Sequence, residues 1–106
     1  MTIEWLDPWM PIEHPEHRAA FEAQLRREVG SGHALSGQAP TALAKRGDQD
    51  DVLFCLEDGR VAEVHLTWRR QAETDARWPG AIISSSIEEW IADRMRPHHA
   101  QVRSDE

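Results

Sequence analysis

Hydrophobic and polar residues alternate most clearly between residues 51 and 68. Two runs rich in β-forming residues flank the pair Asp58-Gly59 in this stretch. An Asp-Gly pair between two such runs is typical of a β-hairpin with a two-residue turn, because glycine tolerates the positive φ that this turn requires. The pattern therefore predicts a hairpin around which the remaining chain is organised.

A two-residue turn fixes which residues of the hairpin face each other. It places Leu53 opposite Val64 and Phe54 opposite Glu63. The face expected to point toward the core then carries only apolar residues, namely Leu53, Cys55, Ala62, Val64, Leu66 and Trp68. The other face mixes apolar and polar residues, namely Val52, Phe54, Leu56, Val61, Glu63, His65 and Thr67. We expect this second face to be half covered, by a helix, by the N-terminal segment or by a second protein chain.

Two helices are expected outside the hairpin. The first begins at Pro15, carries an apolar stripe at Phe21, Leu25 and Val29, and ends at Gly30 in a left-handed cap. The second begins after a capping box, in which the Ser86 hydroxyl and the Glu89 carboxylate each satisfy an amide of the first turn. Its apolar side includes Trp90, and Pro97 is expected to end it because proline interrupts a helix interior.

Two further strands are expected, over Thr41–Arg46 and over Ala81–Ser84. In the first of them Ala42 and Ala44 are expected on one side and Leu43 on the other. The chain is thus predicted to be one α+β domain over residues 1–106. It should contain a three- to four-stranded antiparallel sheet built on the central β-hairpin and flanked by an N-terminal and a C-terminal helix, both stacked on one face. A Trp- and Pro-rich arm over residues 1–14 should pack on the domain, and residues 98–106 should form a loose polar tail.

Charge and composition narrow the class of protein. The formal net charge is -7, which argues against nucleic-acid binding, because affinity for phosphate comes from clustered Lys and Arg. The N-terminus has no signal-peptide pattern, and no apolar run approaches the length of a membrane span. The single cysteine, Cys55, excludes an intramolecular disulfide and is consistent with a reducing compartment. We therefore expect a cytoplasmic protein with no cofactor and no membrane partner.

Histidine supplies the candidates for chemistry, with six in the chain. His65 and Glu63 lie two residues apart on one strand, where an imidazole and a carboxylate could perform general acid/base catalysis in a small hydrolase or transferase. The alternative is a partly buried imidazole that is hydrogen-bonded to a neighbour. His14 with His17, and His98 with His99, suggest metal binding more weakly, because neither pair brings a third ligand at a recognised spacing. No nucleophile elbow, phosphate-binding loop or dinucleotide motif is present in the sequence.

Tryptophan is the most unusual feature of the composition, with five Trp and no Tyr. Trp68 and Trp90 fit core positions by periodicity, whereas the other three lie next to prolines or in irregular segments. Because tryptophan is enriched at interface anchors, an interaction surface is one interpretation and a cover over a small core is the other. The residues predicted for the interaction surface are Trp5, Trp9, Val52, Phe54, Leu56, His65 and Trp78.

Several segments spread over nearly the whole chain resemble a group of small uncharacterised bacterial proteins that share a Val-His-Leu-Thr-Trp strand. They are Trp5-Leu6-Asp7-Pro8-Trp9, Asp51-Val52-Leu53-Phe54, Glu57-Asp58-Gly59-Arg60, Val64-His65-Leu66-Thr67-Trp68 and Trp78-Pro79. The resemblance implies a bacterial, stand-alone cytosolic protein and brings no activity with it. From the residues themselves we expect a non-enzymatic domain that binds a protein partner, either by forming a homodimer or as an acidic inhibitor or immunity-like protein.

Overall fold

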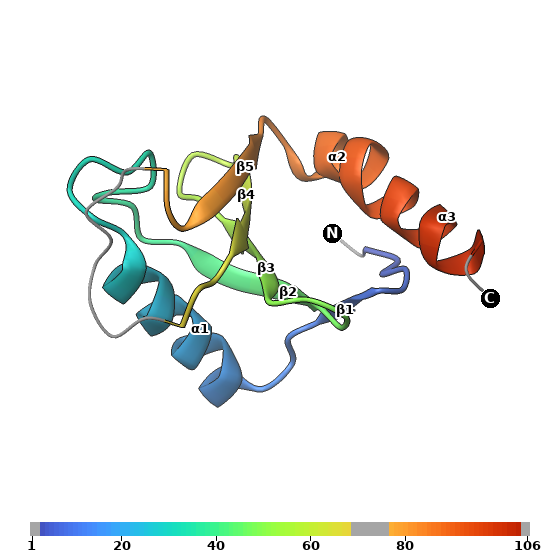
Figure 1. The fold of residues 1–106 in the computed structure, drawn as a ribbon, viewed down its shortest axis with the longest axis horizontal. Helices are drawn as coiled ribbons and strands as arrows, with labels where there is room; N and C mark the ends of the chain where they lie inside the picture. Colours follow the sequence, from blue (N-terminus) through green and yellow to red (C-terminus); the bar gives the residue numbers. More distant parts are fainter. Residues whose placement is uncertain (1–2, 69–76, 105–106) are drawn as a thin grey trace.

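The structure is a computed structural model that describes residues 3–68 and 77–104. An antiparallel sheet lies at its centre, with helices on both sides (Figure 1). The elements in chain order are β1 (Trp9–Pro11), α1 (Pro15–Glu28), β2 (Thr41–Arg46), β3 (Asp51–Cys55), β4 (Val61–His65), β5 (Gly80–Ser84), α2 (Ile87–Trp90), the π-turn η1 (Ile91–Met95) and α3 (Arg96–Ser104). Among these residues no helix is both long enough and apolar enough to span a bilayer.

The sheet has five strands in the order β1-β2-β3-β4-β5, so every strand pairs with its neighbour in the sequence. The predicted α+β class and antiparallel sheet are confirmed, with one strand more than expected. The additional strand is β1, which the arm forms by pairing Trp9 with Arg46 and Pro11 with Ala44. Two prolines near this segment exclude a helix, but an edge strand accommodates a proline because one of its sides needs no hydrogen bond.

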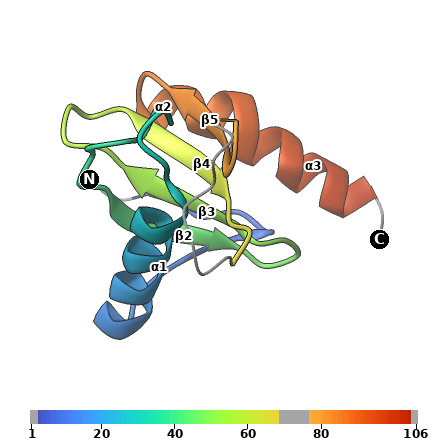
Figure 2. The same cartoon turned by 60° about the vertical axis from the view of Figure 1, so that its left-hand side comes forward.

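The two helical regions lie on opposite faces of the sheet, and not on one face as predicted (Figures 1 and 2). Helix α1 packs on the face that carries Val52, Phe54 and Val64. Helix α2 and the turn η1 pack on the face that carries Leu53 and Val61. The reason is that both faces of the hairpin are apolar, so each face needs a cover of its own.

The hairpin register differs by one residue from the prediction. Leu56 donates to the Arg60 carbonyl at 2.8 Å, and Gly59 donates to the Leu56 carbonyl at 3.1 Å. These bonds close a three-residue loop in which Gly59, with φ of +92°, occupies the left-handed position. Observed pairs are therefore Leu53 with Glu63 and Phe54 with Ala62. The prediction of a two-residue turn was wrong. A glycine in the left-handed conformation occurs in both two-residue and three-residue hairpin loops, so the Asp-Gly pair does not distinguish them.

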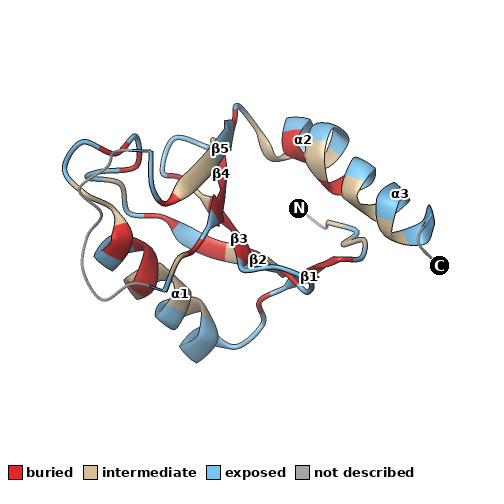
Figure 3. Cartoon of the chain, in the orientation of Figure 1, coloured by how far each residue is buried: buried red, intermediate tan, exposed pale blue. Residues whose placement is uncertain are grey.

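This register changes which residues face together. Val52, Phe54 and Leu56 share a face with the even-numbered residues of β4 and are almost completely buried under α1, with exposures of 0%, 0% and 2%. Leu53 and Val61 share the opposite face with Glu63. Figure 3 shows the buried residues running through the central strands, between the two helical layers. Both faces of the hairpin are therefore covered by helices, and within β3 and β4 only His65 is exposed.

A bulge in β2 alters the predicted faces of this strand as well. Ala42 pairs with Phe54 and Ala44 pairs with Leu53, so Leu43 is the extra residue between them. As a result Ala42 packs in the cluster under α1, whereas Ala44 packs in the cluster under the C-terminal helices. The prediction that these two alanines share a side was wrong.

The C-terminal helix does not end at Pro97. After α2 the chain makes a π-turn, in which the Arg96 amide donates to the carbonyl of Ile91, five residues earlier. Helix α3 then starts at Arg96 and continues to Ser104. Proline is tolerated in the first turn of a helix, where its missing N–H is not needed, so the wide turn lets the chain resume as a helix. Residues 98–104, predicted as a loose tail, are therefore helical.

Helix α1 begins at Pro15 as predicted but ends differently. Its last cap is Val29 in an extended conformation, and no left-handed Gly30 closes it. Ser86 caps α2 as predicted, because its hydroxyl accepts from the Glu89 amide at 3.1 Å. The Glu89 carboxylate accepts from the Ser85 hydroxyl and not from the Ser86 amide of a full capping box.

Candidate functional site

The residues predicted for an interaction surface do not lie on one surface. Val52, Phe54 and Leu56 belong to the buried cluster under α1, so no partner can reach them in this structure. The cause is that α1 covers this face, which the observed register makes apolar by placing Ala62 and Val64 beside Phe54 and Val52. His65 lies on the opposite face, and its side chain is 54% exposed.

The predicted tryptophans also divide. Trp9 is 1% exposed and meets Trp90 edge to face, with ring centroids 4.9 Å apart. Trp5 is half-buried at 6.2 Å from the same Trp90 ring. These three rings cover the sheet under the C-terminal helices, which confirms the core position predicted for Trp90. Trp78 is 46% exposed and is the one tryptophan of the predicted surface that lies at the surface.

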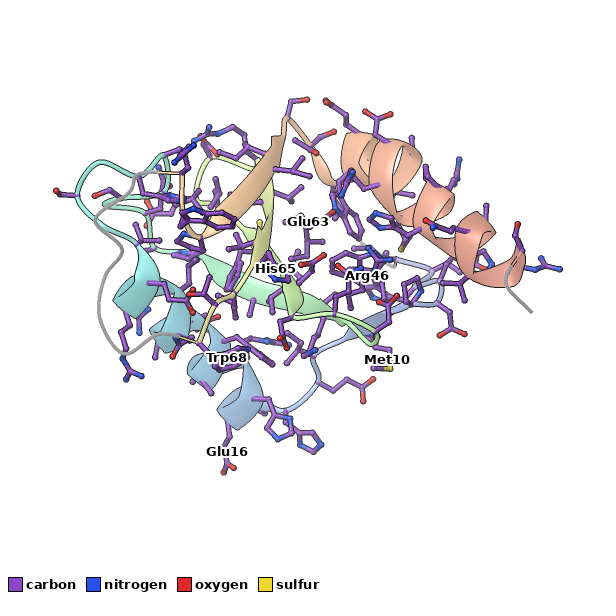
Figure 4. The ribbon with its side chains drawn as sticks, in the orientation of Figure 1. Met10, Glu16, Arg46, Glu63, His65 and Trp68 are labelled. Atoms are coloured by element: carbon purple, nitrogen blue, oxygen red, sulfur yellow. The ribbon has the colours of Figure 1, made fainter. Side chains whose placement is uncertain are left out.

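Trp68 was predicted in the core and is 48% exposed instead. Strand β4 ends at His65, and Trp68 has a φ of +61°, so the alternation that placed it inward does not extend this far. Its ring contacts that of Phe21 of α1, with centroids 6.0 Å apart, and Figure 4 shows Trp68 beside α1. The backbone here is held by Glu28, a fully buried carboxylate that accepts from the amides of Thr67 and Trp68 at 2.7 and 2.9 Å.

His65 and Glu63 do not form the acid/base pair expected from the sequence. The His65 Nδ1 atom lies 2.6 Å from an oxygen of Asp51, which is directly opposite on β3. The Asp51 side chain is 9% exposed, and its second oxygen lies 4.0 Å from Arg46. Asp51 is visible in the sequence at the start of the neighbouring strand, but the predicted register placed Val52 opposite His65. The observed register places Asp51 there instead.

Glu63 has different partners, although its side chain is only 4% exposed. It accepts from Arg94 through two nitrogens, at 3.0 and 2.8 Å, and from the indole N–H of Trp90 at 3.1 Å. Burial by itself raises the pKa of the Glu63 carboxyl, but the hydrogen bonds from Arg94 and Trp90 outweigh it and leave the pKa below the ordinary 4.5. This contact links the sheet to the C-terminal helices, which is a structural role.

Helix α3 is joined to the N-terminal arm by its two histidines. The Trp9 indole N–H donates to His98 Nδ1 at 3.1 Å, and His99 Nδ1 lies 2.8 Å from the carbonyl oxygen of Asp7. Burial, followed by the positive charges of Arg46 and Arg94, lowers the pKa of His98 below 6.5. Figure 4 shows Arg46, Glu63 and His65 in the space between the sheet and the C-terminal helix.

A metal site is not assembled by the histidine pairs. The His14 and His17 rings are in contact, with centroids 5.0 Å apart. Within residues 3–68 and 77–104, however, no three or more His, Cys, Asp or Glu side chains gather in a way that could hold a metal ion. His98 and His99 use their Nδ1 atoms in the contacts with the arm described above.

The described cavities lie away from His65. One of about 300 Å³ lies between the end of α1 and residues 35–40. A second of about 390 Å³ lies beside the start of α1, where Met10, Ile12 and Phe21 meet His14, His17 and Lys45. A third, also about 390 Å³, lies between the arm and η1. None of these three brings a cavity to the His65–Asp51 pair.

Of the exposed large apolar side chains among the described residues, three lie on β5 or two residues before it, whereas Met10 and Trp68 lie elsewhere. Ile82 and Ile83 are 44% and 37% exposed, and Trp78 is 46% exposed. Strand β5 pairs with β4 on one side and stands at the edge of the sheet (Figure 1). The sequence predicted this strand but not its exposure, since position within a sheet depends on the topology. The sequence feature that could have indicated this exposed edge is the absence of charge in Gly-Ala-Ile-Ile-Ser, since 29% of the residues in the chain are charged.

Comparisons of the chain with protein-family models, with curated proteins and with solved structures gave no match. Neither a family nor a function therefore follows from similarity. Two features of the structure remain as candidates for a functional site. They are the edge of β5, with its exposed apolar side chains, and the His65–Asp51 pair.

Proposed function

We propose that this chain is a protein-interaction domain that binds an extended strand along the edge of β5. The observation that carries the proposal is the pair of exposed isoleucines, Ile82 and Ile83, on an edge strand without a charged residue. An edge strand presents N–H and C=O groups that another strand can pair with. Main-chain bonds then supply affinity, and alternate side chains supply specificity.

The other edge of the sheet supports this choice by contrast. Strand β1 has only three residues and includes Pro11, and both features hinder further strand pairing. Strand β5 has five residues and contains neither proline nor lysine. Natural edge strands are usually protected by such residues, so an unprotected edge with exposed isoleucine is typical of a binding site.

Both faces of β5 offer a contact to an incoming strand. Ile82 pairs with Glu63 and therefore lies on the face of the C-terminal helices, whereas Ile83 pairs with Ala62 and lies on the face of α1. Trp78 precedes the strand and adds a large exposed ring. An extended ligand with apolar side chains on both sides fits this edge better than a basic ligand, although the chain as a whole is acidic.

The enzymatic alternative has less support. A hydrolase or transferase based on His65 and Glu63 needs the two side chains to act together, and Glu63 is instead bonded to Arg94 and Trp90. The His65–Asp51 pair retains the orientation of a general base, but the described cavities do not border it. Binding of a partner strand at the edge of β5 is therefore better supported than catalysis by His65.

Peptide binding tests the proposal. A fluorescently labelled peptide with the sequence of residues 77–86 is titrated with the intact protein, and binding is followed by fluorescence anisotropy. We expect saturable binding that Ile82→Lys weakens by about tenfold or more, because a charge on the edge opposes strand pairing. The matched control is Met10→Lys on the β1 edge, where the residue is 51% exposed, and it should bind like the wild type. Absence of binding, or equal binding by Ile82→Lys, would contradict the proposal.

A further inference from the structure

We infer that the strand bound by β5 is β5 of a second copy of this chain, running antiparallel across a two-fold axis at Ile82. The inference rests on the proposed function, because it requires β5 to be a binding edge. It adds the identity of the partner, the symmetry of the complex and the register of the two strands.

The difference between the two edges selects this symmetry. Pairing of β5 with β1 of another copy would be head-to-tail and would extend without closing. It would also have to use β1, which has three residues including Pro11 and whose Trp9 is 1% exposed. Pairing of β5 with β5 uses the longer and more exposed edge twice and closes the assembly at two copies.

Charge supports a second copy in the antiparallel direction. Two copies with a net charge of -7 repel each other, but Gly80–Ser84 brings no charge into the contact. Arg77 precedes the strand, and the exposed Glu88 and Glu89 follow it. A two-fold antiparallel pair places the start of one strand beside the end of the other, so Arg77 of each copy approaches these glutamates of the other. A parallel pair would bring like charges together.

The length of β5 sets the register. Only a two-fold axis at Ile82 pairs all five residues, Gly80 with Ser84 and Ala81 with Ile83 of the other copy. The two Ile82 side chains then lie directly opposite each other, with Cβ atoms about 4.5–5.5 Å apart. Ile83 extends the contact on the face of α1. An axis at Ile83 would pair Ile83 with itself, but it would place Ile82 opposite Ser84 and pair only three residues of each strand.

The size of the contact predicts its strength. Stable interfaces bury about 1,200–2,000 Å² in total, and a five-residue strand pair is small on this scale. The side chains of Trp78, Ile82 and Ile83 therefore supply much of the apolar area. We expect a dimer that forms in the micromolar range or above and dissociates on dilution.

Sedimentation velocity over a range of concentrations tests the dimer. The wild type should pass from 12.1 kDa toward twice this mass as its concentration rises. Ile82→Lys and the milder Ile82→Thr should raise the dissociation constant, the former by about tenfold or more, while Met10→Lys should not. Circular dichroism confirms that each variant is folded. A wild-type protein that stays at the monomer mass up to about 1 mM would overturn the inference.

Disulfide trapping tests the register. In a Cys55→Ser background, Ile82→Cys should form an intermolecular disulfide under mild oxidation, because residue 82 faces itself across the axis. Ile83→Cys, at the exposed neighbouring position, should not, since residue 83 faces residue 81 of the other copy. Trapping through Met10→Cys and not through Ile82→Cys would overturn the two-fold β5 pair. Peptide binding by a protein that remains a monomer would refute the dimer and leave the proposed function standing, whereas loss of both would refute both.

Discussion

Under α1 the sheet is packed mainly with aliphatic side chains and Phe54. Under the C-terminal helices it is packed with tryptophan rings that lie beside the Glu63–Arg94 ion pair. The first cluster contains Phe54 and aliphatic side chains, packed against Leu25 of α1. The second contains Trp9 and Trp90, and beside it the buried Glu63 is bonded to Arg94. The two faces of one sheet thus differ in their packing, although α1 is also bonded to the chain after β4 through the buried Glu28.

The difference has consequences for specificity. Apolar packing depends on area and shape, so the contacts of Phe54 and the aliphatic side chains under α1 should tolerate changes of similar volume. The Glu63–Arg94 contact depends on direction and charge, and it fixes where the C-terminal helices sit on the sheet. A substitution on one face leaves the other face unchanged as a reference.

The largest loss is expected on the apolar face. Phe54→Ala removes a ring that is 0% exposed and leaves a cavity, which should lower the free energy of unfolding by about 4 kcal/mol. Urea denaturation measures the loss, and it should be equal at pH 8 and pH 5.5 relative to the wild type. Ile82→Ala at the exposed edge is the control and should cost less than about 1 kcal/mol. A similar small loss for Phe54→Ala would show that the ring is not packed under α1.

A smaller loss is expected on the polar face. Arg94→Met keeps much of the side-chain volume but leaves the Glu63 carboxylate without its cation, which should cost about 2 kcal/mol, since Arg94 is partly exposed. Glu63→Gln with Arg94→Met should cost less than the sum of the two single changes. The matched control is Arg60→Met at the exposed pair with Asp58, where no resolvable change is expected. Additive losses at Glu63 and Arg94 would mean that the pair is not coupled.

Local patterns predicted the elements better than their arrangement. Pro15, Asp58-Gly59 and Ser86 act within a few residues of the chain, and each marks a helix start or a turn that the structure contains. The hairpin register was not accessible in this way, because Gly59 in a left-handed conformation is equally suited to a two-residue and a three-residue loop. The helix beyond Pro97 was missed because the π-turn before it has no local signature.

The candidate site was predicted only in part for a related reason. Exposure of Trp78 agrees with the predicted surface, whereas Phe54 is buried because α1 covers its face of the sheet, a placement that the sequence left open. Ile82 and Ile83 are apolar and β-branched, which predicts a strand but does not reveal whether that strand lies inside a sheet or at its edge. Edge position follows from the order of all five strands, which depends on contacts distant in the sequence.

The smallest effect is expected from pH, at His98 and Glu63 on the polar face. Because the pKa of His98 lies below 6.5 in the folded chain, the unfolded chain takes up the proton first, and stability falls as the pH drops below about 6.5. Protonation also removes the acceptor of the Trp9 indole N–H. Glu63 adds a further loss at lower pH, since its contribution is present above about 4.5 and disappears as the pH falls through its lowered folded pKa.

His98→Asn separates the histidine contribution from that of Glu63. The asparagine keeps an oxygen acceptor near Trp9 but has no titrating group in this range, so the decline between pH 6.5 and pH 5 should become shallower. Urea denaturation at half-unit steps of pH measures the profile. His14→Asn, which changes an exposed histidine outside this network, should keep the wild-type slope. If His98→Asn left the slope unchanged while Arg94→Met altered it below pH 5, the acid sensitivity would belong to the Glu63 contact alone, and the joint between α3 and the arm would be insensitive to pH.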